Sequence, residues 1–309
     1  MYIGIDIGGM SIKAGIVTEN GEILAKHAVP TPLTNNEDFL NAMLEASKEA
    51  MKQAGVSEKD ITAIGIGAPG ACNREKAVLI GATNIPYKNA AAGEFFRENL
   101  ANVPVLVDND ANCAALGEFY KSGDISDFVF VTLGTGVGGG IIIDRKLFTG
   151  SNGMGAELGH IVTHAGGRPC GCGRKGCWEA YASVTGLINL TCENRERIKS
   201  ISHDEIISGR TVFEYAKQGD EEARRVRDEW IEEVAIGITD MVNIFQPDKI
   251  VVGGAISKEG DVIMEPIRKY VAENCYRAEG LKIPEVVASK IGGDAGIIGA
   301  AFLYKNKTE

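Results

Sequence analysis

The feature that most constrains this chain is a cysteine-rich segment, residues 157–179, because a metal ion bound there would hold four side chains around one point. Three thiols and two imidazoles occur within it, and three thiols with one imidazole complete the ligand set of a structural tetrahedral Zn²⁺ site. The expected ligands are His160, Cys170, Cys172 and Cys177. Two alternatives stay open. The cysteines are buried as small hydrophobic residues, or His164 is the rival ligand to His160.

Composition places the chain among ordinary globular proteins and argues against several function classes. Of its 309 residues, 44% are hydrophobic and 24% are charged, which suits a folded chain long enough for two domains. The net charge of −10 and the lack of a Lys/Arg cluster argue against nucleic-acid binding. No apolar run is long enough to span a membrane, and no signal segment precedes the first strand. The other cysteines form no disulfide-like framework, so we expect a cytoplasmic protein.

Apolar patterning predicts a chain of the α/β class. An Asn-Gly turn joins the second and third strands, so the chain opens with a β-meander. The first helix has a cap candidate in Asn35 or Asn36, and the longest amphipathic helix stops before Pro247. We expect strands at 2–7, 11–18, 22–27, 61–66, 103–107, 128–133, 140–144 and 249–252. We expect helices at 36–53, 111–120, 220–245 and 295–304, the last packed on the N-terminal domain.

A succession of strand, glycine turn and strand occurs twice. Gly8 and Gly9 follow the first strand, and the glycine-rich run 134–140 follows the strand at 128–133. The repetition indicates two related halves. We expect a small α/β domain formed by residues 1–117 with 295–309, and a large α/β domain formed by 118–294.

The glycine-rich run 134–140 formally contains G-x-G-x-x-G after a strand, so a dinucleotide-binding fold has to be considered. That fold needs a helix directly after the glycines, whereas three β-branched isoleucines follow here. The run is therefore interpreted as a hairpin turn. Its backbone N–H groups and the hydroxyl of Thr135 could hold phosphate oxygens. A tight turn without a ligand is the alternative.

Two glycine turns, one in each half, could grip a phosphate chain from two sides. Asp6 stands at the end of the first strand, where a carboxylate can hold Mg²⁺ for phosphoryl transfer from ATP. Gly253 and Gly254 follow another apolar strand and would leave space for a base or ribose. The residues assigned to the nucleotide site are Asp6, Gly8, Gly9, Ser11, Lys13, Gly134, Thr135, Gly136, Gly138, Gly253 and Gly254.

The acceptor side of such a reaction is expected at residues 108–112, between a strand and a helix. Asp110 is the natural catalytic base, since a carboxylate must accept the proton of the attacking hydroxyl. Asn109 supplies both a donor and an acceptor for a neighbouring hydroxyl. The alternative is a helix cap, a role that Asp108 or Asn109 could fill.

Taken together, these motifs resemble the ROK family of sugar kinases and sugar-responsive repressors. The motifs are Asp6-Ile-Gly-Gly9, Ile66-Gly-Ala-Pro-Gly70, Asn109-Asp-Ala-Asn112, the run 134–140, Glu157-Leu-Gly-His160 and the cysteine cluster ending at Glu179. The resemblance implies an actin-like ATPase (ribonuclease H-like) fold with two domains around a central cleft. It implies that Asp110 deprotonates a sugar hydroxyl, usually at C6, and that His160 and the three cysteines bind structural zinc. The sugar contacts it implies are Asn109, Glu157, His160 and Glu179, with Asn84 as a further contact.

The chain departs from the family pattern at two places. Position 10 is Met10 where the family usually has threonine, so Ser11 or the backbone would have to hold the phosphate. Asn84 lies in a segment that only loosely matches the glucokinase motif. The expected activity is transfer of the ATP γ-phosphate to the 6-hydroxyl of a hexose, with glucose the first choice. Kinases for N-acetylmannosamine, N-acetylglucosamine, allose or fructose are the near alternatives, because epimer selection depends on hydrogen-bond geometry that a sequence does not reveal.

Two functions other than a kinase are considered for a chain of this kind. A sugar-sensing regulator would need a DNA-binding extension ahead of the first strand, and a non-catalytic scaffold would not need Asp110. The resemblance implies a homodimer or homotetramer. Removal of zinc is expected to weaken sugar binding more than nucleotide binding, because the ligands lie beside the acceptor residues and away from the glycine turns.

Overall fold

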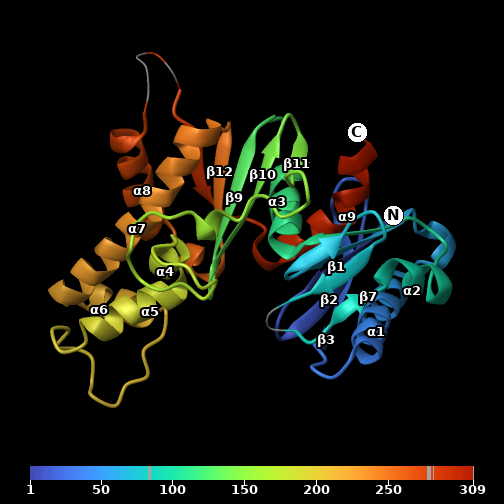
Figure 1. The fold of residues 1–309 in the computed structure, drawn as a ribbon, viewed down its shortest axis with the longest axis horizontal. Coiled ribbons are helices and arrows are strands. Elements are labelled where there is room, and N and C mark those ends of the chain that lie inside the picture. The colour runs from blue at the N-terminus through green and yellow to red at the C-terminus, as the bar shows by residue number, and fades with distance from the viewer. Residues whose placement is uncertain (83–84, 277–279, 281, 309) are drawn as a thin grey trace. The chain divides into compact units, whose positions relative to one another are not determined.

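The computed structural model describes residues 1–82, 85–276, 280 and 282–308. The chain divides into two compact units (Figure 1). The first contains Met1–Phe128, Gly140–Ala156 and Gly293–Glu309, and the second contains Val129–Gly139 and Glu157–Gly292. The expected domain boundary at residues 117 and 118 stays a prediction. Among the described residues, no helix combines the length and apolar character needed to cross a membrane.

The first unit is built on a five-stranded sheet in the order β3-β2-β1-β4-β8. Strands β1, β2 and β3 form the expected antiparallel meander, while β4 and β8 extend the sheet in parallel from β1. The strands are β1 (Tyr2–Ile7), β2 (Ser11–Val17), β3 (Ile23–Pro30), β4 (Ala63–Ala68) and β8 (Val105–Asn109). Since β1, β4 and β8 run in parallel, their carboxyl ends lie at one edge of the sheet, where an α/β protein places its ligands.

Helices cover both faces of this first sheet. Ile3 and Ile5 of β1 are fully buried in one hydrophobic cluster with Phe39 of α1 (Asn36–Ala54). The alternate residue Gly4 faces the other way, where a methyl group would overlap the backbone of α9 (Ala295–Thr308). Glycine thus allows α9 to pack directly on the sheet, which confirms that the last helix returns to the N-terminal part of the chain.

Smaller elements complete the first unit. A three-stranded sheet has the order β5-β6-β7, and α3 packs closely against α9. These elements are β5 (Ala71–Asn73), β6 (Val78–Gly81), β7 (Lys88–Ala90), α2 (Ala92–Asn99), α3 (Asp110–Tyr120) and the 3₁₀ helices η1 (Glu58–Asp60) and η4 (Gly292–Asp294).

The second five-stranded sheet has the order β11-β10-β9-β12-β13, which repeats the connectivity of the first. In each sheet the first strand in sequence is central, the second and third lie on one side of it, and the fourth and fifth lie on the other. This shared order supports two related halves. The strands are β9 (Phe128–Leu133), β10 (Val137–Ile143), β11 (Lys146–Phe148), β12 (Lys249–Gly253) and β13 (Glu285–Ala288).

The helices of the second unit follow the cysteine-rich segment. The long helix α7 begins after Asp220, whose side chain accepts hydrogen bonds from two backbone N–H groups of its first turn. The helices are η2 (Leu158–His160), α4 (Glu179–Ala182), α5 (Val184–Glu193), α6 (Thr211–Gln218), α7 (Glu221–Phe245), η3 (Ala255–Glu259) and α8 (Asp261–Asn274).

One predicted boundary is wrong in a way that matters for the site. Strand β10 begins at Val137, three residues before the expected start, so Gly138 lies in a strand and only residues 134–136 form the turn. Tertiary packing explains the glycines of the strand. A methyl group at Gly139 would overlap Leu158 and the carbonyl oxygen of Phe130.

Candidate active site

The acceptor segment joins β8 to α3 in the first unit. The side-chain oxygen of Asn109 accepts hydrogen bonds from the N–H groups of Ala111 (2.9 Å) and Asn112 (3.3 Å), so Asn109 is the helix cap. Asp110 is then the first helical residue, half-buried, and it accepts a bond from the N–H of Ala111 at 2.9 Å. Because the cap occupies the amide oxygen of Asn109, its amide nitrogen is the group left to contact a hydroxyl.

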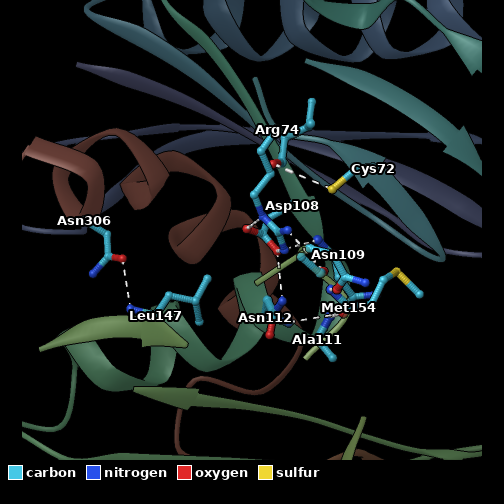
Figure 2. A network of polar contacts seen from close by, with 12 residues as sticks. Cys72, Arg74, Asp108, Asn109, Ala111, Asn112, Leu147, Met154 and Asn306 are labelled. Carbon is cyan, nitrogen blue, oxygen red and sulfur yellow. Dashed lines mark hydrogen bonds and ion pairs between the residues drawn. The ribbon is translucent and has the colours of Figure 1, made fainter. Parts of the chain in front are cut away.

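A buried ion pair holds this segment in place. Arg74 donates two hydrogen bonds to Asp108, from Nε to Oδ2 at 2.6 Å and from Nη2 to Oδ1 at 2.7 Å. Figure 2 shows this pair beside Asn109 and Asn112, and the Asn112 amide nitrogen donates to Asp108 at 2.9 Å. Asp108 is only 3% exposed, so these bonds compensate the burial of its charge. The hydrogen bonds to Asp108 raise the pKa of Arg74 above its usual value.

Sequence reasoning missed Arg74. Asp108 was recognised after a strand, but the arginine that pairs with it stands 34 residues earlier, and no spacing pattern marks the pair. Arg74 also donates from Nη1 to the carbonyl oxygen of Gly153 at 3.1 Å, within the same unit.

Three carboxylates gather at the carboxyl edge of the first sheet. The fully buried thiol of Cys113 has a pKa well above its usual value, first because of burial and then because of the negative charges of Asp108, Asp110 and Asp6. Burial, followed by the charge of Asp110, likewise raises the pKa of Tyr87, whose hydroxyl donates to the carbonyl oxygen of Pro69. The structure therefore brings the predicted magnesium carboxylate and the predicted base to the same edge.

Asp6 lies against the first turn of α9, where a methyl group on Gly296 would come within 2.6 Å of its Oδ1. Lys13 forms an ion pair with Asp6, with 3.3 Å between Nζ and Oδ2. Burial raises the pKa of Asp6, Lys13 opposes that shift, and Asp294 adds to it. Asp6 and Lys13 thus form one charged pair beside the first glycine turn.

The first glycine turn is held by its own strands. The N–H of Gly8 donates to the carbonyl oxygen of Ser11 at 2.9 Å, and the hydroxyl of Thr31 donates to the carbonyl oxygen of Gly8 at 2.6 Å. A methyl group on Gly9 would find no atom within 4 Å, and Met10 is 91% exposed. The tip of this turn is open on its outer side.

The second glycine turn, residues 134–136, is held from another part of the second unit. The N–H of Val184 donates to the carbonyl oxygen of Gly134 at 2.9 Å. The hydroxyl of Thr185 donates to the carbonyl oxygen of Thr135 at 2.6 Å. Both donors begin α5. These contacts could not be inferred from sequence, because they join residues about 50 positions apart.

Close packing explains why glycine occupies positions 253 and 254. A methyl group on Gly253 would come within 2.6 Å of the Phe130 ring, and one on Gly254 would overlap the carbonyl oxygen of Leu133. Gly254 also has a φ of 92°, which favours glycine. Both positions are explained by close approach to β9, and their contact with a base or ribose stays a prediction.

The four expected metal ligands converge. Their ligand atoms all lie within 4.8 Å of one another. The sulfurs of Cys172 and Cys177 are 3.7 Å apart, and the Cys170 sulfur is 3.7 Å from Nδ1 of His160. Tetrahedral Zn–S bonds of about 2.3 Å place two sulfurs about 3.8 Å apart, so the donor set fits structural zinc.

His164 lies outside this cluster. Its ring stacks on Tyr181 with centroids 4.1 Å apart, and its Nε2 lies 3.5 Å from a carboxylate oxygen of Glu233. The carbonyl oxygen of His164 would also overlap a methyl group on Gly176, whose φ is 81°. The rival-ligand alternative is therefore not supported, and His164 instead supports the loop that carries the cysteines.

The two glutamates that flank the cluster have different surroundings. Glu157 is exposed and precedes the short helix that carries His160. Glu179 accepts hydrogen bonds from the Val137 N–H at 3.0 Å and from the Cys170 thiol at 3.5 Å. The metal ligands therefore do lie beside a glycine turn, which corrects the premise of the zinc-removal expectation. Asn84, the remaining predicted sugar contact, lies outside the described residues.

Comparison with known proteins places these observations in a family. Residues 2–307 match the family described as "ROK family". The chain belongs to the ROK family. It is 38% identical to a glucokinase of Streptomyces coelicolor, over 99% of this chain and 98% of that protein.

Solved ROK structures share the fold. A ROK glucokinase from Streptomyces griseus, in complex with glucose and AMPPNP, has a TM-score of 0.79 and 38% identity over 98% of each chain. A ROK hexokinase from Thermus thermophilus has a TM-score of 0.82 and 30% identity over 100% of this chain and 99% of that one. The expected family and the α/β, actin-like class of fold are thus confirmed.

Proposed function

We propose that this ROK protein is an ATP-dependent sugar kinase that transfers the γ-phosphate to the 6-hydroxyl of a hexose, with glucose the first candidate. The observation that carries the proposal is similarity at 38% identity over nearly the whole chain to a glucokinase and to a ROK glucokinase solved with glucose and an ATP analogue. The carboxylates at the edge of the first sheet supply the kind of base and Mg²⁺ ligand that such a reaction needs.

In this proposal Asp110 accepts the proton of the sugar 6-hydroxyl while that oxygen attacks the γ-phosphorus and ADP departs. The reaction depends mostly on positioning and electrostatics, so the fixed position of the base matters more than its intrinsic strength. The Asn109 cap and the Arg74–Asp108 pair hold Asp110 at the start of α3. Asp6 would hold Mg²⁺ directly or through water, and Mg²⁺ would neutralise charge on the β- and γ-phosphates.

The sugar is proposed to contact Asn109, Glu157, His160, Glu179 and Asn84. His160 binds zinc through Nδ1 in this assignment, because that nitrogen lies 3.7 Å from the Cys170 sulfur. The other ring nitrogen then remains for a sugar hydroxyl. When bound, zinc would supply a fixed tetrahedral centre that orients this imidazole.

ADP release with Mg-ATP, measured across hexoses and N-acetylhexosamines, tests the proposal. Turnover is expected with glucose, or with one of N-acetylmannosamine, N-acetylglucosamine, allose and fructose. Asp110→Asn should lower kcat by about 10²–10⁴-fold, the usual contribution of a general base. Asp204→Asn, at a fully exposed carboxylate, is the matched control and should leave kcat unchanged. A folded protein with no sugar-dependent turnover on the panel would contradict the proposal.

We also propose that the protein is a homodimer or homotetramer in the cytoplasm. Sedimentation equilibrium should therefore give two or four times the protomer mass of 32.9 kDa. A single species at the protomer mass would rule the assembly out.

A further inference from the structure

The residues that follow the last cysteine hold the second glycine turn. We call residues 179–185 the clamp segment. It makes three contacts with the turn and with the first residue of β10. The Glu179 carboxylate accepts from the N–H of Val137, the N–H of Val184 donates to the carbonyl oxygen of Gly134, and the hydroxyl of Thr185 donates to the carbonyl oxygen of Thr135. The backbone of the turn is therefore fixed on both of its arms by one short segment.

The clamp segment starts from a rigid residue. Trp178 is fully buried, and its backbone N–H donates to the carbonyl oxygen of Ile161 at 2.8 Å. Its ring N–H donates to the carbonyl oxygen of Glu233, also at 2.8 Å. Gly237 of α7 has no side chain because a methyl group there would overlap the Trp178 ring. The metal ligand Cys177 thus precedes an anchored residue, and Glu179 follows it directly.

Glu179 touches both the metal cluster and the turn. One carboxylate oxygen lies 3.5 Å from the Cys170 sulfur, and the other accepts the Val137 N–H at 3.0 Å. A side chain at Gly136 would overlap this second oxygen, so glycine leaves the place that the carboxylate occupies. The Glu179 carboxylate is therefore the side chain through which a change at the Cys170 sulfur would reach residues 136 and 137.

We propose that Glu179 couples metal occupancy to the conformation of the second glycine turn, so that zinc strengthens nucleotide binding through a positioning residue. Zinc would hold the Cys170 sulfur at a ligand position as a thiolate, which cannot donate to a carboxylate, and the Glu179 side chain, anchored next to Trp178, would then be left to accept from the Val137 N–H. The effect on nucleotide affinity rests on the proposed function, because it requires that residues 134–137 contact nucleotide phosphates. The coupling itself rests only on contacts within the second unit.

The test measures two quantities without sugar: hydrogen exchange at the Val137 amide, and calorimetric affinity for Mg²⁺ with a non-hydrolysable ATP analogue. A role for Glu179 only as a sugar contact would move neither quantity. Wild type, Glu179→Ala, Glu179→Gln and Thr185→Val are each measured with zinc and after chelation. Thr185→Val is the matched control, because it removes one hydrogen bond to the same turn without touching the cluster.

Chelation is expected to weaken nucleotide binding by about tenfold in wild type and in Thr185→Val, the size expected for one lost hydrogen bond to a charged group. Glu179→Ala should show the loss with zinc present, and chelation should add nothing further. Glu179→Gln retains an acceptor for the Val137 N–H and should stay near wild type. If chelation changes hydrogen exchange at the Val137 amide equally in Glu179→Ala and in wild type, the coupling is overturned.

Two further outcomes separate the coupling from the proposed function. If Val137 exchange follows the pattern above while nucleotide affinity stays constant, the coupling stands and the assignment of this turn to nucleotide fails. If the chelated protein unfolds, hydrogen exchange at Val137 is compared among the zinc-loaded variants alone. Val137 protection that is equal in Glu179→Ala, Glu179→Gln and wild type would then overturn the coupling.

Discussion

The two glycine turns follow equivalent strands of two sheets with the same strand order, yet they are supported differently. The turn after β1 is held by its own hairpin and by Thr31, and its outer side is open. The turn after β9 is held by the clamp segment, which begins beside the metal cluster. The same succession of strand, glycine turn and strand is therefore held by different contacts in the two units. Substitutions in the two turns should differ in their effects for that reason.

The acceptor segment of the first unit is held by the ion pair between Arg74 and Asp108. Replacement of Arg74 by methionine leaves the 3% exposed Asp108 carboxylate without its partner. The free energy of unfolding should fall by about 3–5 kcal/mol, because an uncompensated charge stays buried. Chemical denaturation monitors the loss. The double variant with Asp108→Asn should recover part of it, and an unchanged midpoint for Arg74→Met would show that the pair does not anchor the segment.

Alanine substitutions at glycine compare the turns directly. Gly136→Ala places a methyl group where the Glu179 carboxylate lies, whereas Gly134→Ala and Gly9→Ala meet no atom within 4 Å. Gly136→Ala should raise the KM for ATP about tenfold, through loss of the bond between Glu179 and Val137. The other two leave that bond in place, so they should raise the KM less than Gly136→Ala does. Steady-state kinetics at saturating sugar measures the values, and equal effects at all three glycines would remove the distinction between the turns.

The charged pair of the first turn predicts opposite pH trends for stability and binding. Burial raises the pKa of Asp6, so the folded state binds this proton more tightly than the unfolded state does. The resulting stability is present below the unfolded pKa and is lost as pH rises through the folded pKa.

Affinity for Mg²⁺-nucleotide should instead rise over that range, since the metal needs the carboxylate. Unfolding free energy and binding affinity measured against pH, in wild type and Asp6→Asn, check both trends. Asp6→Asn should flatten both curves. Parallel trends in stability and affinity would exclude Asp6 as the magnesium ligand.

The smallest expected effect concerns Met10, which is 91% exposed at the open tip of the first turn. Met10→Thr adds a hydroxyl donor where no packing has to change, so the KM for ATP should fall by roughly threefold, within the contribution of one neutral hydrogen bond. Met10→Val, similar in shape to threonine but without the hydroxyl, is the matched control. Equal KM values for the two variants would show that backbone groups alone hold the phosphate.

Local signals in the sequence predicted much of the fold. Strands β1 and β9 have the expected bounds, and Asn35, one of the two cap candidates, is the cap of α1 because a short polar side chain precedes apolar periodicity. The cysteine cluster was also predictable, since ligand types and spacing are visible along the chain. These features depend on neighbours in sequence.

Contacts between distant residues were not predictable. The Arg74–Asp108 pair and the bond from Thr185 to Thr135 join separate elements, and neither has a spacing signature. The start of β10 was misjudged because glycine normally weakens a strand, whereas here Leu158 and Phe130 leave no room for a side chain at Gly139. Tertiary packing overrode the local preference.

The measurement that tests the central claim most directly is ³¹P NMR of a reaction containing Mg-ATP and the sugar that supports turnover. The account predicts a phosphate ester whose phosphorus couples to the two protons on C6, formed in equal amount to ADP and about 10²–10⁴-fold more slowly with Asp110→Asn. Inorganic phosphate as the only product, or an ester coupled to a single ring proton, would contradict transfer to the 6-hydroxyl.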